Sequence, residues 1–563
     1  MVLEKLIVEA TQPDSRSVLG RILGRNSTWL HVSMPDYEIL SRRDWEETLA
    51  VAKHLADSLA TDKRFVPESH LAPLVTPMSF IVFDHATSKA MEALIPNSFD
   101  VVDSPDFGIY HNRFGMAAGG IDISDADTHC AVQNRQGTSW PWAGGGLGRG
   151  PIPTGLLFQI SQCAPALPLW YQYGFVGPCG LLRMVEGSNH IILAKATWLS
   201  EAETNTIITE AKKNKLLPKL PAIEELFRRR GDGPGNSLTD WPSPAWMAEA
   251  ALFLRWGLYS DSGNKHGLRS KFETFAERSR TEPVTEAMFR ECFGFGYAEM
   301  QSQLGHYLIE AGRKPVLVDD DSLVVHANPT PRPKQSLPAT LACREATPSE
   351  IARLLGDWER MEGKAKRVSD PALSRLYLKR AGKTLHECYD NGERDPRFLA
   401  VLGLYDSDVG ATAEARSMLA IATEAGVARP TAFVTLAQLN FDEALAHPGT
   451  EDGKFNAQQT ATVLKPLFDV RKRARLESAG YLLIAEVWLH SVEKPSLRNL
   501  AVLQEGMELY PFDSALGSAV GRVYAQWGYV AEVRTLIDQR LKFVDAATAK
   551  QLVDLEASLK AGR

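Results

Sequence analysis

The side chains of this chain that could do chemistry are its histidines, cysteines and carboxylates, and their spacing limits the reactions open to them. None of the 13 histidines lies three or four residues from another, the spacing that places two metal ligands on one face of a helix. His129 and Cys130 could form a base and nucleophile pair, but neighbouring side chains on a strand point to opposite faces. We therefore predict no bound metal, no cofactor and no catalytic residue.

Pairs of carboxylates offer a different chemistry, general acid–base catalysis. The candidate acids are Asp122, Asp125, Glu186 and Glu249. Two such groups act together only when folding brings them about 5–10 Å apart, and the sequence does not determine that separation. A hydrolase that acts on peptides or glycans through such residues stays open as an alternative.

One segment carries the pattern of a metal-binding helix pair without its ligands. Residues 154–177 read TGLLFQISQCAPALPLWYQYGFVG and resemble the region of the gluzincin (peptidase MA-like) metallopeptidases that normally holds an HExxH helix, a Pro-containing turn and a WLxEG helix. Alignment on the Pro-Ala-Leu-Pro-Leu-Trp stretch places the two zinc-binding histidines on Pro153 and Leu157, the general-base glutamate on Thr154 and the ligand glutamate on Tyr173.

The resemblance implies a peptidase-like fold that has lost its zinc, because proline and leucine side chains have no lone pair for a metal. The phenol of Tyr173 could bind a metal or a substrate. Without a histidine beside it, we expect the ring to fill the vacated space.

The elements that precede this segment are expected to position it, and their order resembles the small α/β lobe of such peptidases. Residues 28–33 alternate like a strand, and residues 34–36 turn the chain. Ser41 has the position of an N-cap, with Asp44 three residues later, for an amphipathic helix. Ser79–Phe83 reads as a buried strand. The resemblance in element order continues through a hairpin at 181–193 and several helices to residue 312.

Past residue 347 the chain is predicted to be helical to its end. Thr347 and Glu350 have the form of a capping box, with proline at the first helical position. Small and large residues then recur with the spacing of the tetratricopeptide repeat, in which stacked helix pairs bury a shared apolar face. The residues in this pattern are Leu402, Gly403, Ala415, Leu419 and Ala422, then Val520, Gly521, Tyr524, Val533 and Ile537, with irregular units at Leu436–Ala437 and Ile484–Ala485.

The predicted fold class is α+β: a peptidase-like α/β domain with a helical metal-motif region, followed by an all-α tetratricopeptide-like solenoid. The predicted parts are a leader (1–27), an N-terminal α/β lobe (28–152), a mainly helical lobe with the degenerate zinc motif (153–312), a Pro-rich linker (313–346) and the repeat domain (347–563). Within the linker, residues 316–318 and 323–325 could pair as a ribbon around an acidic turn.

Aromatic residues near the degenerate motif suggest where a ligand could bind. Trp140, Trp142, Trp170 and Tyr171 could line a cleft for a peptide or glycan, although core positions are the simpler interpretation. The glycine-rich stretch 144–150 precedes a helix, but it matches neither the phosphate-binding loop nor the dinucleotide spacing, so we expect a loop there.

Composition excludes several classes of function. A net charge of -7 offers no general attraction for nucleic acid, and the basic runs 228–230 and 471–475 are expected to be solvated helix ends. The six cysteines form no CxxC pair, so we expect buried free thiols. Neither a membrane span nor a secretory signal is visible, which makes the cytoplasm the default location, with export open if the start omits a leader.

Two hypotheses for function follow. The first is a noncatalytic peptidase-like protein that binds an unknown protein or peptide through its helical repeats. The second is a hydrolase that uses the same cleft with residues other than zinc ligands. A pure assembly scaffold without a ligand pocket is a third, simpler possibility.

Overall fold

The computed structural model describes residues 28–83, 120–134, 151–179, 182–184, 191–193, 222–228, 244–260, 268–311, 316–318 and 342–540, with the single positions 209, 220 and 550. These residues are mostly helical, with a six-stranded mixed sheet and a small three-stranded sheet. The predicted leader, the glycine-rich stretch and the acidic turn of the predicted linker lie outside the described residues.

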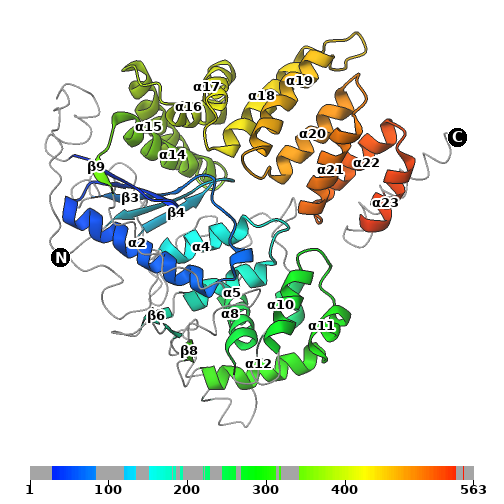
Figure 1. The fold of residues 1–563 in the computed structure, drawn as a ribbon. Helices are drawn as coiled ribbons and strands as arrows, with labels where there is room; N and C mark the ends of the chain where they lie inside the picture. Colours follow the sequence, from blue (N-terminus) through cyan, green and yellow to red (C-terminus); the bar gives the residue numbers. More distant parts are fainter. Residues whose placement is uncertain are drawn as a thin grey trace.

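The six-stranded sheet lies at the centre of the molecule, between helices of the first and the last part of the chain (Figure 1). Its order is β4-β5-β3-β2-β1-β9. Strands β2, β3 and β5 run parallel, whereas β4 pairs with β5, and β1 with both β2 and β9, in antiparallel fashion. The strands are β1 (Leu30–Ser33), β2 (Tyr37–Ser41), β3 (Met78–Phe83), β4 (Gly120–Ser124), β5 (His129–Asn134) and β9 (Cys343–Glu345).

The predicted linker contributes strands to both sheets. Cys343–Glu345 forms β9, which pairs with β1 and supplies the backbone partners that an edge strand would otherwise lack. Val316–Val318 forms β8, which pairs with β7 (Ile191–Leu193) and not with residues 323–325, which lie outside the described residues. The predicted hairpin is confirmed, since β6 (Leu182–Met184) pairs with β7 in antiparallel register.

The start of the first long helix differs from the prediction. Ser41 is the last residue of strand β2, which sequence analysis missed, and its hydroxyl accepts a hydrogen bond from Thr48 Oγ1 at 2.8 Å. Asp44 is the N-cap instead, and its carboxylate accepts from the Glu47 N–H at 2.8 Å. Aspartate caps a helix as well as serine does, so Ser41 can belong to the strand. Helix α2 (Trp45–Phe65) therefore begins three residues after the expected position.

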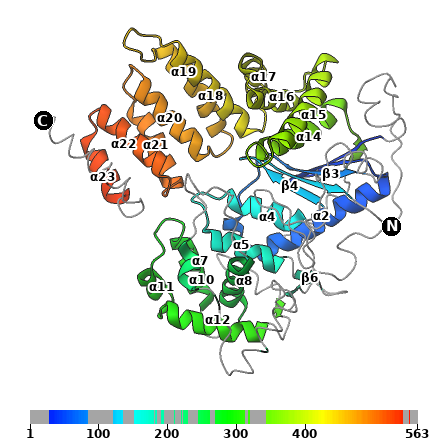
Figure 2. The same cartoon turned by 180° about the vertical axis from the view of Figure 1, so that it is seen from behind.

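Each face of the sheet is covered by helices from a different part of the chain (Figure 2). Helices α2 and α4 (Pro151–Ser161) pack on one face, where Phe80 and Phe158 belong to a common apolar cluster. Helix α14 (Pro348–Ala365) packs on the other face through Trp358 and its neighbours. The predicted boundary at residue 347 therefore does not divide two cores.

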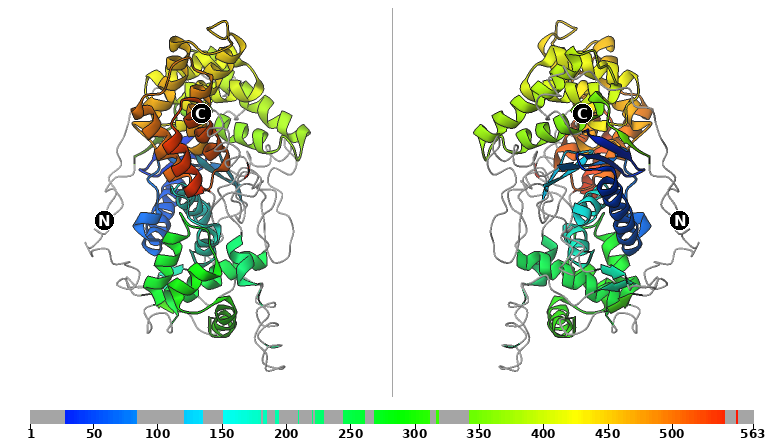
Figure 3. Two further views of the ribbon diagram at one scale, coloured as in Figure 1. Left: turned by 90° about the vertical axis from the view of Figure 1, so that its right-hand side faces the viewer. Right: turned by 90° about the vertical axis from the view of Figure 1, so that its left-hand side faces the viewer.

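A helical lobe lies below α4 and is held together by aromatic side chains. In the side views the repeat, the sheet and this lobe follow one another from top to bottom (Figure 3). Trp170 is fully buried at the centre of its core and packs edge-on against Phe253 at 5.2 Å between ring centroids. The helices of the lobe are α5 (Leu169–Cys179), α7 (Ile223–Arg228), α8 (Pro244–Tyr259), α10 (Leu268–Arg278), α11 (Glu286–Phe293) and α12 (Tyr297–Ala311).

The last part of the described chain is a solenoid of helix pairs, as predicted. The capping box is confirmed, since Thr347 and Glu350 exchange hydrogen bonds at the start of α14. The first helix of each pair packs on its own partner and on the first helix of the next pair. The helices are α14, α15 (Pro371–Asp390), α16 (Pro396–Val409), α17 (Thr412–Glu424), α18 (Pro430–Ala446), α19 (Ala457–Arg471), α20 (Ser478–His490), α21 (Leu497–Leu509), α22 (Ser514–Gln526) and α23 (Val530–Arg540).

Small residues permit this close stacking. Gly403 of α16 lies so near α17 that a Cβ atom there would approach Leu419 Cγ to 2.7 Å. A larger side chain would force the two helices apart. The tetratricopeptide-like spacing seen in the sequence thus corresponds to a real close approach between paired helices.

Candidate functional site

The four positions of the degenerate motif lie on two helices that pack against each other. Pro153 and Thr154 lie in the first turn of α4, and Leu157 follows one turn later with its side chain buried. Tyr173 lies on α5, packs edge-on against Trp246 at 6.0 Å, and burial raises the pKa of its phenol to about 12. Its hydroxyl therefore stays protonated at neutral pH. Among the residues that the structure describes, no group of three potential ligands is placed to hold a metal ion.

The aromatic residues proposed for a cleft divide into two groups. Trp170 and Tyr171 are buried at the centre of the helical lobe, 0% and 2% exposed. They lie in the aromatic core and not on a surface that a ligand could reach. Trp140 and Trp142 lie outside the described residues, so a role in a cleft stays a prediction for them.

A chain of hydrogen bonds that sequence analysis missed begins at Tyr171. Its hydroxyl lies 2.6 Å from His70 Nδ1, and His70 Nε2 lies 2.5 Å from a carboxylate oxygen of Glu277. The hydrogen bond from His70, with Arg280 adding positive charge, lowers the pKa of Glu277 to about 2. The order hydroxyl, imidazole, carboxylate is that of a nucleophile with its base, but here the hydroxyl is inside a core. We infer that these two hydrogen bonds hold the 3-10 turn η1 (Glu68–His70) against α5 and α10.

Of the four candidate acids, the structure describes the side chains of Asp125 and Glu249, and these two lie in different parts of the fold. Asp122 lies on β4, Glu186 lies outside the described residues, and Asp125 belongs to the turn between β4 and β5, where it binds Arg360 and Lys364. Glu249 lies on α8 in the helical lobe, 2% exposed, and burial raises the pKa of its carboxyl to about 8. It is the one carboxylate of a largely apolar helix, a signal that the sequence does contain.

His129 and Cys130 point to opposite faces of the sheet, as predicted. His129 stacks on Phe158 of α4, and its Nδ1 lies 2.8 Å from the Ser124 hydroxyl. Cys130 belongs to the cluster under α14. Burial lowers the pKa of His129 to about 3, so the ring is neutral and helps to close the β4–β5 hairpin.

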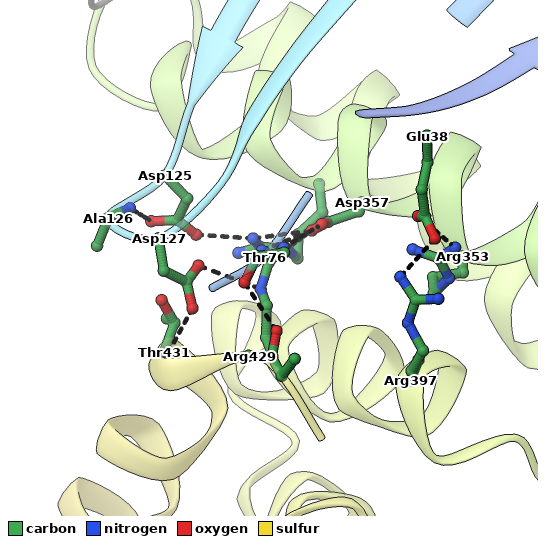
Figure 4. Close-up of polar contacts among 12 residues, drawn as sticks. Glu38, Thr76, Asp125, Ala126, Asp127, Arg353, Asp357, Arg397, Arg429 and Thr431 are labelled. Carbon is green, nitrogen blue, oxygen red and sulfur yellow. Dashed lines mark hydrogen bonds and ion pairs between the residues drawn. The ribbon is translucent and has the colours of Figure 1, made fainter. Parts of the chain in front are cut away.

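Among the described residues, a cluster of charged side chains joins the sheet to the solenoid, and we call it the interdomain seam (Figure 4). At its centre is the Arg360 guanidinium, 1% exposed. It donates to Asp125 at 2.7 Å, to Asp408 at 2.8 Å and to Asp357 at 2.9 Å. Burial alone would raise the pKa of Asp125, but Arg360, Lys364 and Arg429 hold it well below its usual range.

Three further arginines complete the seam, one on one side of Arg360 and two on the other. Arg429 lies 3.0 Å from Asp357 and 3.2 Å from Asp127. On the other side, Glu38 of β2 accepts from Arg353 of α14 at 2.7 Å and from Arg397 of α16 at 2.5 Å. A neutral bond adds to these contacts, from the Thr76 hydroxyl to the Ala428 carbonyl at 2.8 Å.

The sequence contains a signal for part of this seam. Arg353, Asp357 and Arg360 recur at helical spacing along α14, which places charges of both signs on one face of a helix. Their partners Glu38, Asp125 and Asp127 are distant in sequence, and no local pattern connects them. The sequence therefore indicates the charged face of α14 but not the partners that it binds.

The basic run 471–475 is not merely a solvated helix end. Arg471 forms an ion pair with Glu505 of α21, and Arg473 donates to the Gly426 carbonyl at 2.7 Å. These side chains connect neighbouring helix pairs. In the other run, Arg228 pairs with Glu225 on its own helix, whereas residues 229 and 230 lie outside the described residues. None of the described helices is both long and apolar enough to cross a membrane.

Comparison with known proteins finds no matching family model and no matching curated protein. Two solved structures show a weak likeness. TTC0263, a thermophilic TPR protein of Thermus thermophilus, is 16% identical, and the match covers 36% of this chain and 99% of that chain with a TM-score of 0.24. Yeast Tom70 is 12% identical, with 64% of this chain and 73% of that chain covered and a TM-score of 0.24. Such scores carry no argument of their own, so the helical repeat rests on the stacked helix pairs of this chain.

We predict that Arg360→Met destabilises the protein strongly. The change leaves three carboxylates, with side chains 9–16% exposed, without the buried cation that they share, and loss of one partner of a buried ion pair costs about 3–5 kcal/mol. The urea midpoint of unfolding, followed by circular dichroism, measures the effect. Arg375→Met, at an exposed position of α15, is the matched control and should leave the midpoint unchanged. Equal midpoints for both variants would show that the seam does not depend on Arg360.

A second prediction concerns pH. The pKa of Glu249 is near 4.5 when the chain is unfolded and about 8 when it is folded, so the folded state keeps a proton that the unfolded state loses. The free energy of unfolding therefore decreases as pH rises from 4.5 to 8.

Glu249→Gln should remove this dependence and stabilise the protein at pH 8 by about 1–3 kcal/mol relative to the parent. Unfolding midpoints across the pH range test the prediction. The exposed Glu224→Gln is the control and should follow the parent. A parallel displacement of the Glu249→Gln profile, without a change of slope, would contradict the assignment.

Proposed function

We propose that this chain is a noncatalytic protein, with a peptidase-like body that has lost its zinc ligands and a tetratricopeptide-like repeat that binds a protein or peptide partner. The observation that carries the proposal is the packing at the motif positions. Leu157 and Tyr173 belong to one buried apolar cluster, on two helices that contact each other. Side chains that build a core in this way do not bind a dication or activate water.

The repeat supports the binding half of the proposal. Five helix pairs stack from Pro348 to Arg540, and such solenoids present long surfaces that partners recognise. Much of the first helix of the second pair, α16, is already buried between other elements. On α22, the first helix of the last pair, the side chains of Arg522 and Gln526 are exposed. We infer that the partner binds along this helix.

The loss of zinc is tested by metal analysis of the full-length chain purified with zinc in the buffer. We expect no stoichiometric zinc after dialysis, and no peptidase activity that a chelator abolishes. A known gluzincin peptidase, treated in the same way, is the control that must retain its metal. One tightly bound zinc per chain would overturn the proposal.

A second candidate function is a hydrolase that works without zinc, and Glu249 is the observation that favours it. A carboxyl with a pKa of about 8 is protonated at neutral pH, the state that a general acid requires. Chelator-resistant hydrolysis of a peptide or glycan that disappears in Glu249→Gln would support this function over the noncatalytic one.

The position of the partner is tested by photo-crosslinking in the full chain. Removal of residues 347–563 is unsuitable, because it would uncover the face of the sheet that α14 protects. A photoreactive phenylalanine at Gln526 of α22 should crosslink to the partner, whereas one at Lys465, which is also exposed but lies on α19 of another pair, should not. The purified partner must then bind the parent chain by calorimetry. Equal crosslinking from both positions would place the binding surface elsewhere.

A further inference from the structure

The solenoid is attached to the rest of the protein in two different ways. Helices α14 and α15 share an apolar cluster with the sheet, through Trp358 and Tyr377. From α16 onward the apolar core of the solenoid includes none of the described residues that precede α14. The later helices are therefore held over the body by polar contacts, chiefly those of the interdomain seam.

Part of the seam has the form of a ligand in a binding site. The turn between β4 and β5, residues 125–128, enters the repeat near α14 and the start of α18, and presents two aspartates separated by one residue (Figure 4). The Asp125 carboxylate contacts Arg360 at 2.7 Å and Lys364 at 3.6 Å. The Asp127 carboxylate accepts from the Thr431 N–H at 2.6 Å, in the first turn of α18, and contacts Arg429.

The Ala126 N–H of the turn itself donates to Asp125 at 3.0 Å, and the cations and the Thr431 N–H that bind the two carboxylates come from the repeat. A cation and free backbone N–H groups at the start of a helix together form a favourable site for an anion. Arg360 and Arg429 are both almost fully buried, with side chains 1% and 8% exposed. The repeat thus carries two preformed carboxylate sites, both occupied by the protein's own turn.

The site that holds Asp127 has poorer hydrogen-bond geometry than the site that holds Asp125. Arg429 Nε and Asp127 Oδ1 lie 3.2 Å apart, yet neither atom makes a hydrogen bond of acceptable geometry. Burial raises the pKa of Asp127, and Arg429 does not fully offset this. Asp125, in contrast, has its pKa held low by its cations. Release of the turn should therefore begin at Asp127.

We propose that the β4–β5 turn is an internal ligand of the repeat, and that an acidic partner segment with two aspartates separated by one residue binds at the same two sites when the turn leaves. The identity of the occupant rests on the proposed function, since it assumes that the repeat binds a protein partner. A partner segment can bind only those molecules in which the turn has left the two sites. Its apparent affinity is therefore the affinity for the free sites multiplied by the fraction of molecules in which the sites are free.

The test uses the full chain and its own turn as the probe. A fluorescent peptide of residues 120–134 is titrated into the parent and into Asp127→Asn, which keeps the shape of the turn but removes one charge. We expect Asp127→Asn to bind the peptide at least about tenfold more tightly than the parent, with binding weakened by salt. A peptide with asparagine at both aspartate positions is the control and should not bind. Equal affinities for parent and variant, or for the two peptides, would overturn the proposal.

A measurement on the unmodified chain covers the case in which the variant does not fold. Added salt should weaken the seam and speed amide hydrogen exchange in the first turn of α18, while α14 stays protected by its apolar packing on the sheet. Unchanged exchange in α18, or equal opening of both helices, would refute an ionic internal ligand. Because neither experiment needs a natural partner, failure to find one by crosslinking would leave these results intact.

Discussion

Helix α14 packs on the sheet with one part of its surface and on the solenoid with another, and the position of every later helix depends on this double packing. Trp358 and Leu354 lie in the cluster between the helix and the sheet, whereas Ala352 belongs to the core of the solenoid. Between these two apolar surfaces, Arg353, Asp357 and Arg360 occupy the remaining part of the helix. The helix therefore has little surface left for water, and most of its residues are buried.

Charges buried in this way contribute more to fixing the position of the solenoid on the sheet than to the free energy of unfolding. A buried ion pair recovers little more than the cost of removing both groups from water, so apolar residues of equal volume would often stabilise as well. Arg360 nevertheless accepts only one arrangement, because its donors must meet Asp125, Asp357 and Asp408 together. We infer that the seam fixes the angle at which the solenoid leaves the sheet, while the cluster under α14 supplies the apolar driving force.

Local patterns in the sequence predicted local structure well. The capping box at Thr347, the hairpin between β6 and β7 and the close approach at Gly403 all depend on residues within a few positions of one another or on one helix pair. The prediction at Ser41 was wrong because two capping residues lie three positions apart and the short, fully buried strand β2 was overlooked. Strand β9 was assigned to a linker because a three-residue strand has no periodicity to recognise, and its pairing with β1 is a long-range contact. The contacts that matter for function are those that sequence patterns describe least: Glu38 and Arg353 are 315 residues apart, and Asp125 and Arg360 are 235 apart. In each case the residue type alone predicts a solvated side chain, and only the fold reveals a buried partner.

The packing of the body also restricts where a ligand can bind. Aromatic rings around Trp170 fill the centre of the helical lobe. Helices α4 and α5, which carry the degenerate motif, contribute side chains to this dense core. A core of this density resists the rearrangement that a new pocket would require. The solenoid, in contrast, has exposed polar side chains on α22 and charged sites that carboxylates already occupy. Recognition by this protein is therefore expected to use the repeat and the seam at its base, with the body as the support that holds them.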